Sequence, residues 1–184
     1  MIRLFDLFLS VVGLLCCVVI FPPLFIIGYL DTGNPLLRQS RVGLKQKPFD
    51  LFKFRTMKID TETLPTHLAS SDSVTSFGNF LRKTKLDELP QLWNVLKGDM
   101  SLVGPRPCLP SQHNLIEARA KLGAFSVRPG ITGLAQINGI DMSRPELLAK
   151  TDAEMLDDFS IIQYFKYIFL TLVGKGSGDQ IRGK

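Results

Sequence analysis

The sequence has 184 residues, of which 45% are hydrophobic, and a formal net charge of +5 at pH 7. This length fits one globular domain with its own core plus a membrane segment, whereas two full domains would be crowded. The three cysteines and two histidines argue against a disulfide framework, a zinc site and a histidine-based triad, and the positive charge indicates an anionic partner: a nucleic acid, an acidic bilayer or a phosphorylated substrate.

The chain begins with an apolar stretch, residues 7–30, which contains no charged residue. At about 1.5 Å per residue it is just long enough to cross a hydrocarbon core of about 30 Å. Pro22 and Pro23 are expected to break it, because proline removes backbone donors and clashes with the preceding turn. Three interpretations remain open: a kinked single span, a re-entrant hairpin, and a cleaved signal peptide, although no small-x-small cleavage site follows Leu30. The basic residues of the C-terminal flank favour a cytoplasmic globular part, and these are Arg38, Arg41, Lys45 and Lys47.

The next segments alternate between short extended pieces and turns. Residues 36–57 predict a β-hairpin, and the polar residues 59–76 predict a loop. Residues 77–85 predict a short helix with its apolar residues on one side. Lys53 and Arg55 belong to the predicted hairpin, where the residues alone fit solvated strand-face cations as well as a binding site.

Two adjacent carboxylates, Asp87 and Glu88, precede a short predicted helix whose apolar residues recur at i, i+3, i+4 and i+7. Asp87 is the expected N-cap of that helix, a position where backbone N–H groups and the helix dipole keep a carboxylate ionised as a nucleophile or metal ligand. On the residues alone, an ordinary solvated acidic pair at a helix start remains the simpler interpretation.

Two stiff turns carry arginines beyond this helix. Residues 98–107 end with Arg106 between two prolines, and residues 127–139 contain Arg128 beside a proline and glycines. An arginine held in this way suits a phosphate group. Further on, residues 144–158 predict an acidic helix.

Residues 159–173 form an aromatic-rich apolar run of 15 residues, which is too short to span a membrane. Tyr164 and Tyr167 beside Lys166 are residue types that settle at a bilayer interface, so an interfacial amphipathic helix is predicted. A buried core helix remains an equal alternative. The final residues 174–184 are expected to form a surface tail.

The sequence contains no GxxxxGK[ST], GxGxxG, HExxH or GxSxG motif. A carboxylate that attacks a phosphoryl group must overcome charge repulsion, so a divalent metal ion and several guanidinium groups are its expected companions. Asp87 and Glu88, together with Arg82, Arg106 and Arg128, supply such a set.

Several longer motifs cover nearly the whole chain: RLFD at residues 3–6, KFRTM at 53–57, LDELPQLWNVLKGDMSLVGPRP at 86–107 and VRPGITGLAQINGI at 127–140. In this order they resemble the small monotopic phosphoglycosyl transferases of the bacterial sugar transferase family. The resemblance implies transfer of a phosphosugar from a UDP-sugar to undecaprenyl phosphate, with UMP as the second product, at the first membrane step of surface glycan assembly.

The resemblance also implies roles for residues. Asp87 would be the nucleophile that carries a covalent phosphosugar, and Glu88 would help to hold Mg²⁺ with it. The remaining matched residues would bind substrate phosphates, and these are Arg82, Arg106 and Arg128, with Lys53 and Arg55 near the same mouth.

The implied fold is α+β and mostly helical, with a re-entrant membrane helix in residues 1–31, a cytoplasmic catalytic domain with interfacial helices in residues 32–173, and the tail. The implied location is the cytoplasmic face of the bacterial inner membrane, in contact with membrane lipids. Pro23 matches a family proline, but Pro22 replaces the serine that precedes it and cannot bond the backbone groups at the break. Gln163 occupies a position that is often acidic.

Two other classes of protein remain as alternatives. A non-catalytic, membrane-anchored scaffold of a glycan-assembly complex would use the cations to bind acidic lipid. A nucleic-acid-binding module is permitted by the net charge, but the sequence lacks interleaved aromatic and basic residues and carries an apolar anchor, so no nucleic-acid partner is expected. An oligomer is possible.

Overall fold

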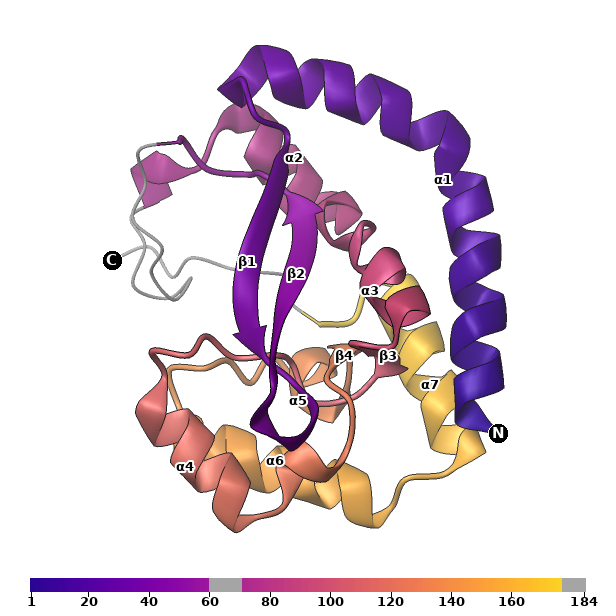
Figure 1. Cartoon of the computed structure of the whole chain (residues 1–184), viewed down its shortest axis with the longest axis vertical. Helices are drawn as coiled ribbons and strands as arrows, with labels where there is room; N and C mark the ends of the chain where they lie inside the picture. Colours follow the sequence, from indigo (N-terminus) through magenta and orange to yellow (C-terminus); the bar gives the residue numbers. More distant parts are fainter. Residues whose placement is uncertain (60–70, 177–184) are drawn as a thin grey trace.

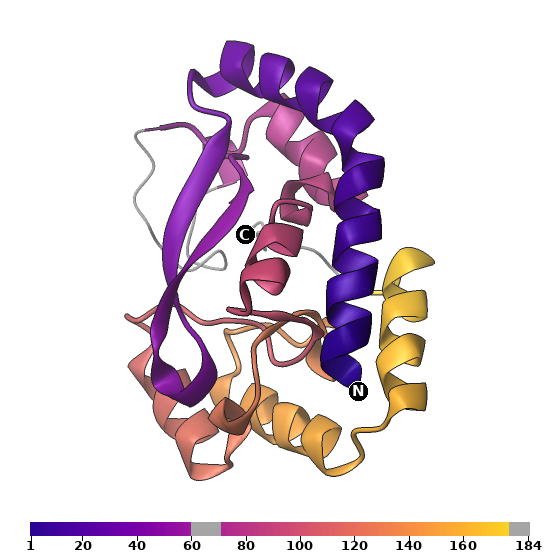
Figure 2. The ribbon, with the colours of Figure 1, turned by 45° about the vertical axis from the view of Figure 1, so that its right-hand side comes forward.

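A computed structural model describes residues 1–59 and 71–176. The fold is mostly helical with a small antiparallel hairpin, as predicted. The long first helix arches around the shorter helices of the centre, and the C-terminal half closes the base (Figures 1 and 2). The helices are α1 (Ile2–Thr32), α2 (Ser76–Thr84), α3 (Gln91–Lys97), α4 (His113–Lys121), α5 (Leu134–Ile137), α6 (Pro145–Asp157) and α7 (Ile161–Leu172). The strands are β1 (Leu36–Val42), β2 (Pro48–Phe54), β3 (Ser101–Val103) and β4 (Gly130–Thr132). Within the described residues, 3-10 turns cover Leu44–Gln46, Ser71–Ser73, Leu86–Glu88 and Ala124–Ser126.

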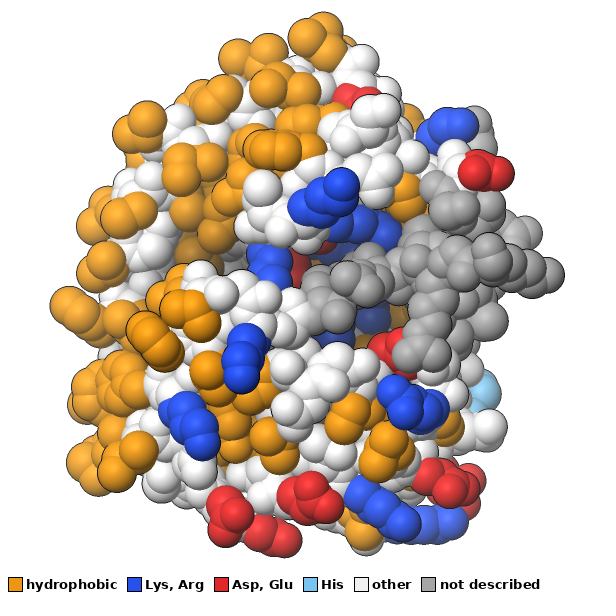
Figure 3. Space-filling model, turned by 180° about the vertical axis from the view of Figure 1, so that it is seen from behind, with side chains coloured by type: hydrophobic (Ala, Val, Ile, Leu, Met, Phe, Trp, Pro, Cys, Tyr) orange, Lys and Arg blue, Asp and Glu red, His pale blue; other side chains and the backbone are white. Residues whose placement is uncertain are grey.

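Helix α1 buries a narrow stripe of mostly small or polar residues and exposes its apolar side chains. The buried residues are Asp6, Ser10, Cys17, Leu24 and Gly28. Their spacing of four, seven, seven and four places them on one helical face. A helix of a water-soluble protein buries its apolar side instead, so the outer surface of α1 suits lipid. Figure 3 shows hydrophobic side chains gathered along the side of the molecule that α1 and α7 form.

The break expected at Pro22 and Pro23 takes the form of a bend and does not interrupt the helix. Both prolines lie inside one helix, which Figure 1 shows bent into two arms. A proline removes one helical hydrogen bond and tilts the axis, and here packing holds the second arm in place. The rings of Phe21 and Phe25 lie 5.6 and 5.2 Å from the ring of Phe54 on β2.

Helix α1 is long and apolar enough to cross a membrane. A spanning helix and a re-entrant helix share this length and composition.

The predicted hairpin is confirmed. Strands β1 and β2 pair antiparallel, with Leu36 opposite Phe54. Helix α3 is joined to this hairpin by the fully buried side chain of Asn94. The Asn94 Oδ1 accepts a hydrogen bond from the Phe52 backbone N–H at 3.0 Å, and its Nδ2 donates to the Asp50 carbonyl oxygen at 2.6 Å. The Asn94 side chain therefore bonds the β2 backbone in the way that a neighbouring strand would.

The two stiff turns predicted from the sequence are joined by a short parallel pair, β3 and β4, with Ser101 opposite Gly130. The Gly130 N–H donates to the Pro105 carbonyl oxygen at 2.9 Å. The backbones approach so closely that a Cβ at Gly130 would lie 2.0 Å from the Gly104 nitrogen. Because only glycine tolerates this contact, these glycines hold the arginine-bearing turns side by side.

A buried carboxylate ties α1 to the C-terminal half. The Asp6 Oδ1 accepts hydrogen bonds from the Ser101 hydroxyl at 2.9 Å, from the Leu102 N–H at 3.0 Å and from the Tyr164 hydroxyl at 2.9 Å. The bond between Tyr164 and Asp6 fixes α7 against the start of α1.

Of the two alternatives left open for this helix, the tyrosines follow the buried core helix and do not lie at a membrane interface. Tyr164 and Tyr167 are buried, because their rings complete the core between α7 and the start of α1. Other α7 side chains are apolar and exposed, and these are Ile162, Phe165, Phe169 and Leu172. The helix thus has a core side and an apolar outer side. Of the predicted tail, residues 177–184 lie outside the described part of the chain, as do residues 60–70 of the predicted loop.

Candidate active site

Asp87 and Glu88 lie in the 3-10 turn Leu86–Glu88, between α2 and α3. The N-cap of α3 is Pro90, so the prediction that Asp87 caps this helix is wrong. Helix α2 ends at Lys85, which has a φ of 58°. The chain therefore changes direction at Lys85, before α3 begins. Both acidic residues are buried, with exposed fractions of 2% for Asp87 and 9% for Glu88.

Glu88 is paired with Arg106, the arginine between two prolines. The Arg106 Nη2 lies 2.7 Å from the Glu88 Oε1, in a contact that is both a hydrogen bond and an ion pair. The two side chains are 24% and 11% exposed. A charge-assisted bond in such a poorly hydrated place is stronger than a pair on the open surface, so it fixes the guanidinium next to the acidic pair.

Three cations, including Arg106, line one small cavity. Lys53 comes from β2 and Arg41 from β1, and both are buried. Gln91, on the first turn of α3, completes the polar lining. The sequence predicted Lys53 and Arg106 as binding residues but missed Arg41, although an Arg-x-Gly stretch at residues 41–43 is readable in the chain. The cavity is chemically suited to an anion.

The other predicted binding residues are held by separate contacts. The Arg82 Nε donates to the Thr56 hydroxyl at 2.9 Å. The Arg55 Nε donates to the Asn34 carbonyl oxygen at 2.9 Å, and the Arg128 Nε donates to the Gly98 carbonyl oxygen at 2.8 Å. The structure thus brings Arg106 together with Glu88 through their ion pair and with Lys53 around one cavity. Arg82, Arg55 and Arg128 each donate to an oxygen of a neighbouring segment.

Lys85, two residues before Asp87, is a further neighbour of the site that no sequence pattern indicated. Burial lowers the pKa of the Lys85 ammonium, the Glu88 carboxylate opposes that shift, and the Arg106 guanidinium adds to it. The Lys85 Nζ donates to the Lys175 carbonyl oxygen at 2.9 Å. The residues after α7 therefore approach the acidic pair.

Among residues 1–59 and 71–176, no group of three or more His, Cys, Asp or Glu side chains is placed to hold a metal ion. Asp87 and Glu88 are an adjacent pair of oxygen donors in this region. Mg²⁺ is commonly held by one or two carboxylates together with substrate phosphates, so the donor set fits that ion.

The apolar outer faces of α1 and α7 and the buried acidic pair among cations define a class of protein: membrane-associated, with a site suited to phosphorylated compounds. The sequence matches the family described as bacterial sugar transferase over residues 1–175, and the chain belongs to that family.

Several relatives are similar over much of this chain. The identity is 41% over 172 residues to the uncharacterized sugar transferase EpsL of Bacillus subtilis (strain 168), with 92% of this chain and 84% of that protein covered. It is 35% over 186 residues to the galactosyl transferase CpsE of Streptococcus agalactiae serotype III, covering 92% and 41%. It is 38% over 169 residues to the UDP-glucose:undecaprenyl-phosphate glucose-1-phosphate transferase of Escherichia coli (strain K12), covering 86% and 35%. The chain thus spans most of EpsL but less than half of the other two proteins.

Proposed function

We propose that the protein transfers a phosphosugar from a UDP-sugar to undecaprenyl phosphate, giving undecaprenyl-diphospho-sugar and UMP, as the first membrane step of surface glycan assembly. The observation that carries this proposal is the buried Asp87–Glu88 pair with Arg106 bonded to Glu88 at 2.7 Å. It supplies a nucleophile and a fixed cation in a membrane-associated member of the sugar transferase family. The name of the Escherichia coli relative describes the same type of reaction.

In the first half-reaction, an Asp87 carboxylate oxygen attacks the phosphorus atom bonded to the sugar oxygen. A new P–O bond forms to Asp87, and the P–O bond to the uridylate oxygen breaks, so UMP leaves with the bonding electron pair. Arg106 is positioned by Glu88, and its guanidinium stabilises the negative charge on the phosphoryl oxygens. Lys53 and Arg41, which lie near Arg106, add positive charge that attracts the diphosphate toward this part of the protein.

In the second half-reaction, an oxygen of undecaprenyl phosphate attacks the phosphorus atom on Asp87. The new P–O bond completes a diphosphate, and the bond to Asp87 breaks and restores the carboxylate. Arg82, Arg128 and Arg55 are the remaining cations proposed to guide one phosphate or the other. Two half-reactions at one nucleophile predict ping-pong kinetics.

Asp87 and Glu88 would hold Mg²⁺, which supplies charge neutralisation at the transferring phosphate when it is bound. The protein's own contribution is to keep both carboxylates buried and Glu88 fixed by Arg106. Chelation of divalent ions is therefore expected to abolish turnover, and added Mg²⁺ to restore it.

The proposed location is the cytoplasmic face of the bacterial inner membrane, with α1 re-entrant. The bend in α1 supports this topology, because a bent helix can enter and leave on one side. A cysteine introduced at Met1 should react with an impermeant thiol reagent only after the inner membrane is opened. Labelling from the periplasmic side would instead establish a span.

The proposal is tested by UMP release from a panel of UDP-sugars with Mg²⁺ and undecaprenyl phosphate. A panel is needed to identify the sugar, because the relatives' names include both galactosyl and glucose transfer. The wild type should release UMP from at least one donor, and Asp87→Asn should release none. Lipid binding without UMP release from any donor would favour the non-catalytic scaffold instead.

A further inference from the structure

A buried ion pair outside the acidic site joins α4 to α6. The Arg119 Nε donates to the Asp152 Oδ2 at 2.8 Å, and the Arg119 Nη2 lies 2.7 Å from the same oxygen. The two side chains are 2% and 1% exposed. Arg119 is the largest fully buried side chain in the described part of the protein.

Stability alone is a poor reason for such a pair. Two charges lose their hydration on burial, and a well-packed apolar pair is often as stable or more stable. Burial raises the pKa of Asp152, although Arg119 opposes that shift. Within residues 1–59 and 71–176, the Asp152 Oδ1 has no hydrogen-bond partner. The ion pair therefore does not fully compensate the lost hydration of the two buried charges. A role for the Arg119 guanidinium should be sought in its other contacts.

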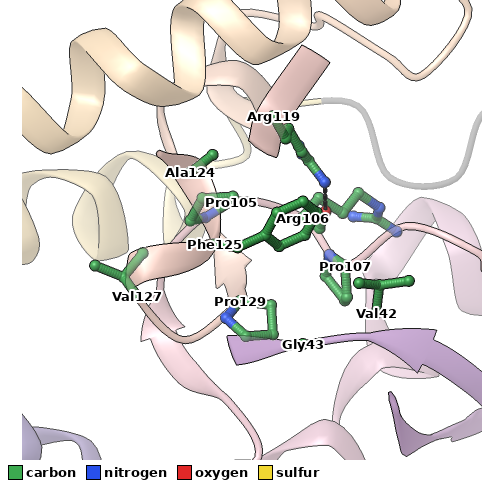
Figure 4. A pocket seen from close by; sticks show the side chains of 10 residues that line it. All are labelled: Val42, Gly43, Pro105, Arg106, Pro107, Arg119, Ala124, Phe125, Val127 and Pro129. Carbon is green, nitrogen blue, oxygen red and sulfur yellow. Dashed lines mark hydrogen bonds between the residues drawn. The ribbon is translucent and has the colours of Figure 1, made fainter. Parts of the chain in front are cut away.

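The third contact of Arg119 leads to the candidate active site. Its Nη1 donates to the Arg106 carbonyl oxygen at 2.7 Å. Figure 4 shows the Arg119 side chain directed at that oxygen, with Phe125, Pro105 and Pro107 around it.

The segment around Arg106 is held by its carbonyl oxygens. Pro105 and Pro107 have no N–H to donate, so their carbonyl groups are the available backbone contacts. The Pro105 oxygen accepts from the Gly130 N–H at 2.9 Å, and the Pro107 oxygen accepts from the Arg41 Nη1 at 3.0 Å. Arg119 holds the carbonyl between them. Three consecutive carbonyls are therefore fixed from β4, α4 and β1.

We propose that Arg119, oriented by Asp152, is a positioning residue that fixes the Arg106 backbone so that the Arg106 guanidinium meets Glu88. The Asp152 carboxylate holds the Arg119 fork in place, and the fork holds the central carbonyl of the Pro-Arg-Pro segment. A small displacement there would move the guanidinium tip away from Glu88, and such misplacements lower turnover by about 100-fold when positioning is lost. As a claim about turnover, this inference rests on the proposed function.

The first test replaces the ion pair with apolar residues in the full-length protein, as Arg119→Met with Asp152→Leu. A purely structural pair would tolerate this exchange, but methionine cannot donate to the Arg106 carbonyl. We expect thermal unfolding within a few degrees of the wild type and a kcat for UMP release at least 10-fold lower. Lys121→Met, on the exposed side of the same helix, is the control and should leave kcat unchanged.

The second test repeats the exchange in an Arg106→Gln background, which lacks the guanidinium that Arg119 is proposed to position. We expect less than a twofold further change in kcat there, because residues that act through one another are not additive. A folded Met–Leu variant with wild-type kcat, or a full multiplicative loss in the Arg106→Gln background, would overturn the inference. Should the Met–Leu variant not fold, Arg119→Lys, which keeps the charge but loses the fork, is judged by the same two criteria.

A readout independent of turnover separates this inference from the proposed function. In protein with ¹⁵N-labelled arginine, the ion pair to Glu88 should slow rotation of the Arg106 guanidinium. That slowing should be lost in the Met–Leu variant and kept in Lys121→Met. A wild type that releases no UMP but shows this difference would refute the proposed function and leave the positioning inference standing. Slowed rotation that persists in the Met–Leu variant would refute the positioning inference.

Discussion

Replacement of Arg106 by glutamine should separate the effect of its ion pair on stability from its effect on turnover. The pair to Glu88 spans 2.7 Å, and its side chains are 24% and 11% exposed. Breaking a fully buried pair from one side costs about 3–5 kcal/mol, whereas an exposed pair contributes about 0–1 kcal/mol. Because the Arg106 side chain is partly exposed, the pair lies between these two cases. We therefore expect Arg106→Gln to lower the free energy of unfolding by about 2 kcal/mol.

The effect of Arg106→Gln on turnover should exceed its effect on stability. Loss of one fixed donor at a developing oxyanion costs about 100- to 1,000-fold in kcat, and we expect a loss in that range for UMP release. The matched control is Arg38→Gln, which breaks an ion pair to Asp50 whose side chains are 69% and 39% exposed. That control should leave both quantities unchanged. A folded Arg106→Gln protein that loses less than threefold in kcat would refute the catalytic role of Arg106.

Three further predictions concern the frame of the site. Asn94→Ala should lower the free energy of unfolding by about 2–3 kcal/mol, because it removes the side chain bonded to the hairpin, whereas the exposed Asn79→Ala on α2 should change it little in denaturant titrations. Gly130→Ala should abolish UMP release and lower the unfolding temperature, because a Cβ would meet the Gly104 nitrogen at 2.0 Å; wild-type behaviour would contradict the close pairing of β3 and β4. Burial raises the pKa of the Cys108 thiol, so Cys108 should resist a water-soluble thiol reagent at pH 8 until the protein unfolds. Peptide mapping distinguishes it from the exposed Cys16, and rapid labelling of Cys108 in the native protein would show that the core there is open.

Local patterns in the sequence were sufficient for the elements whose signal is local. The hairpin, the α2 and α6 helices and the acidic pair before α3 all follow from periodicity, turn residues and adjacent charges. The candidate site was reached through motifs, since the residues alone left Asp87 and Glu88 as an ordinary helix start.

The remaining features depend on contacts between distant parts of the chain. Tyr164 turns inward because Asp6, 158 residues away, accepts its hydroxyl proton in a hydrogen bond. Helix α1 continues through two prolines because its second arm packs on Phe54. Arg119 reaches Arg106 from another helix. None of these contacts has a periodic signal. Local patterns therefore left α7 open between the bilayer interface and a buried core, predicted a break at Pro22 and Pro23, and did not indicate that Arg119 is buried.

The covalent intermediate on Asp87 is the central claim and can be measured directly. The purified protein is incubated with Mg²⁺ and its UDP-sugar in the absence of undecaprenyl phosphate, then quenched and examined by intact and peptide mass spectrometry. We predict a mass increase of one phosphosugar on the peptide that contains Asp87, one equivalent of UMP released, and loss of the adduct when undecaprenyl phosphate is added. UMP release without any adduct, or an adduct that persists in Asp87→Asn, would contradict the account.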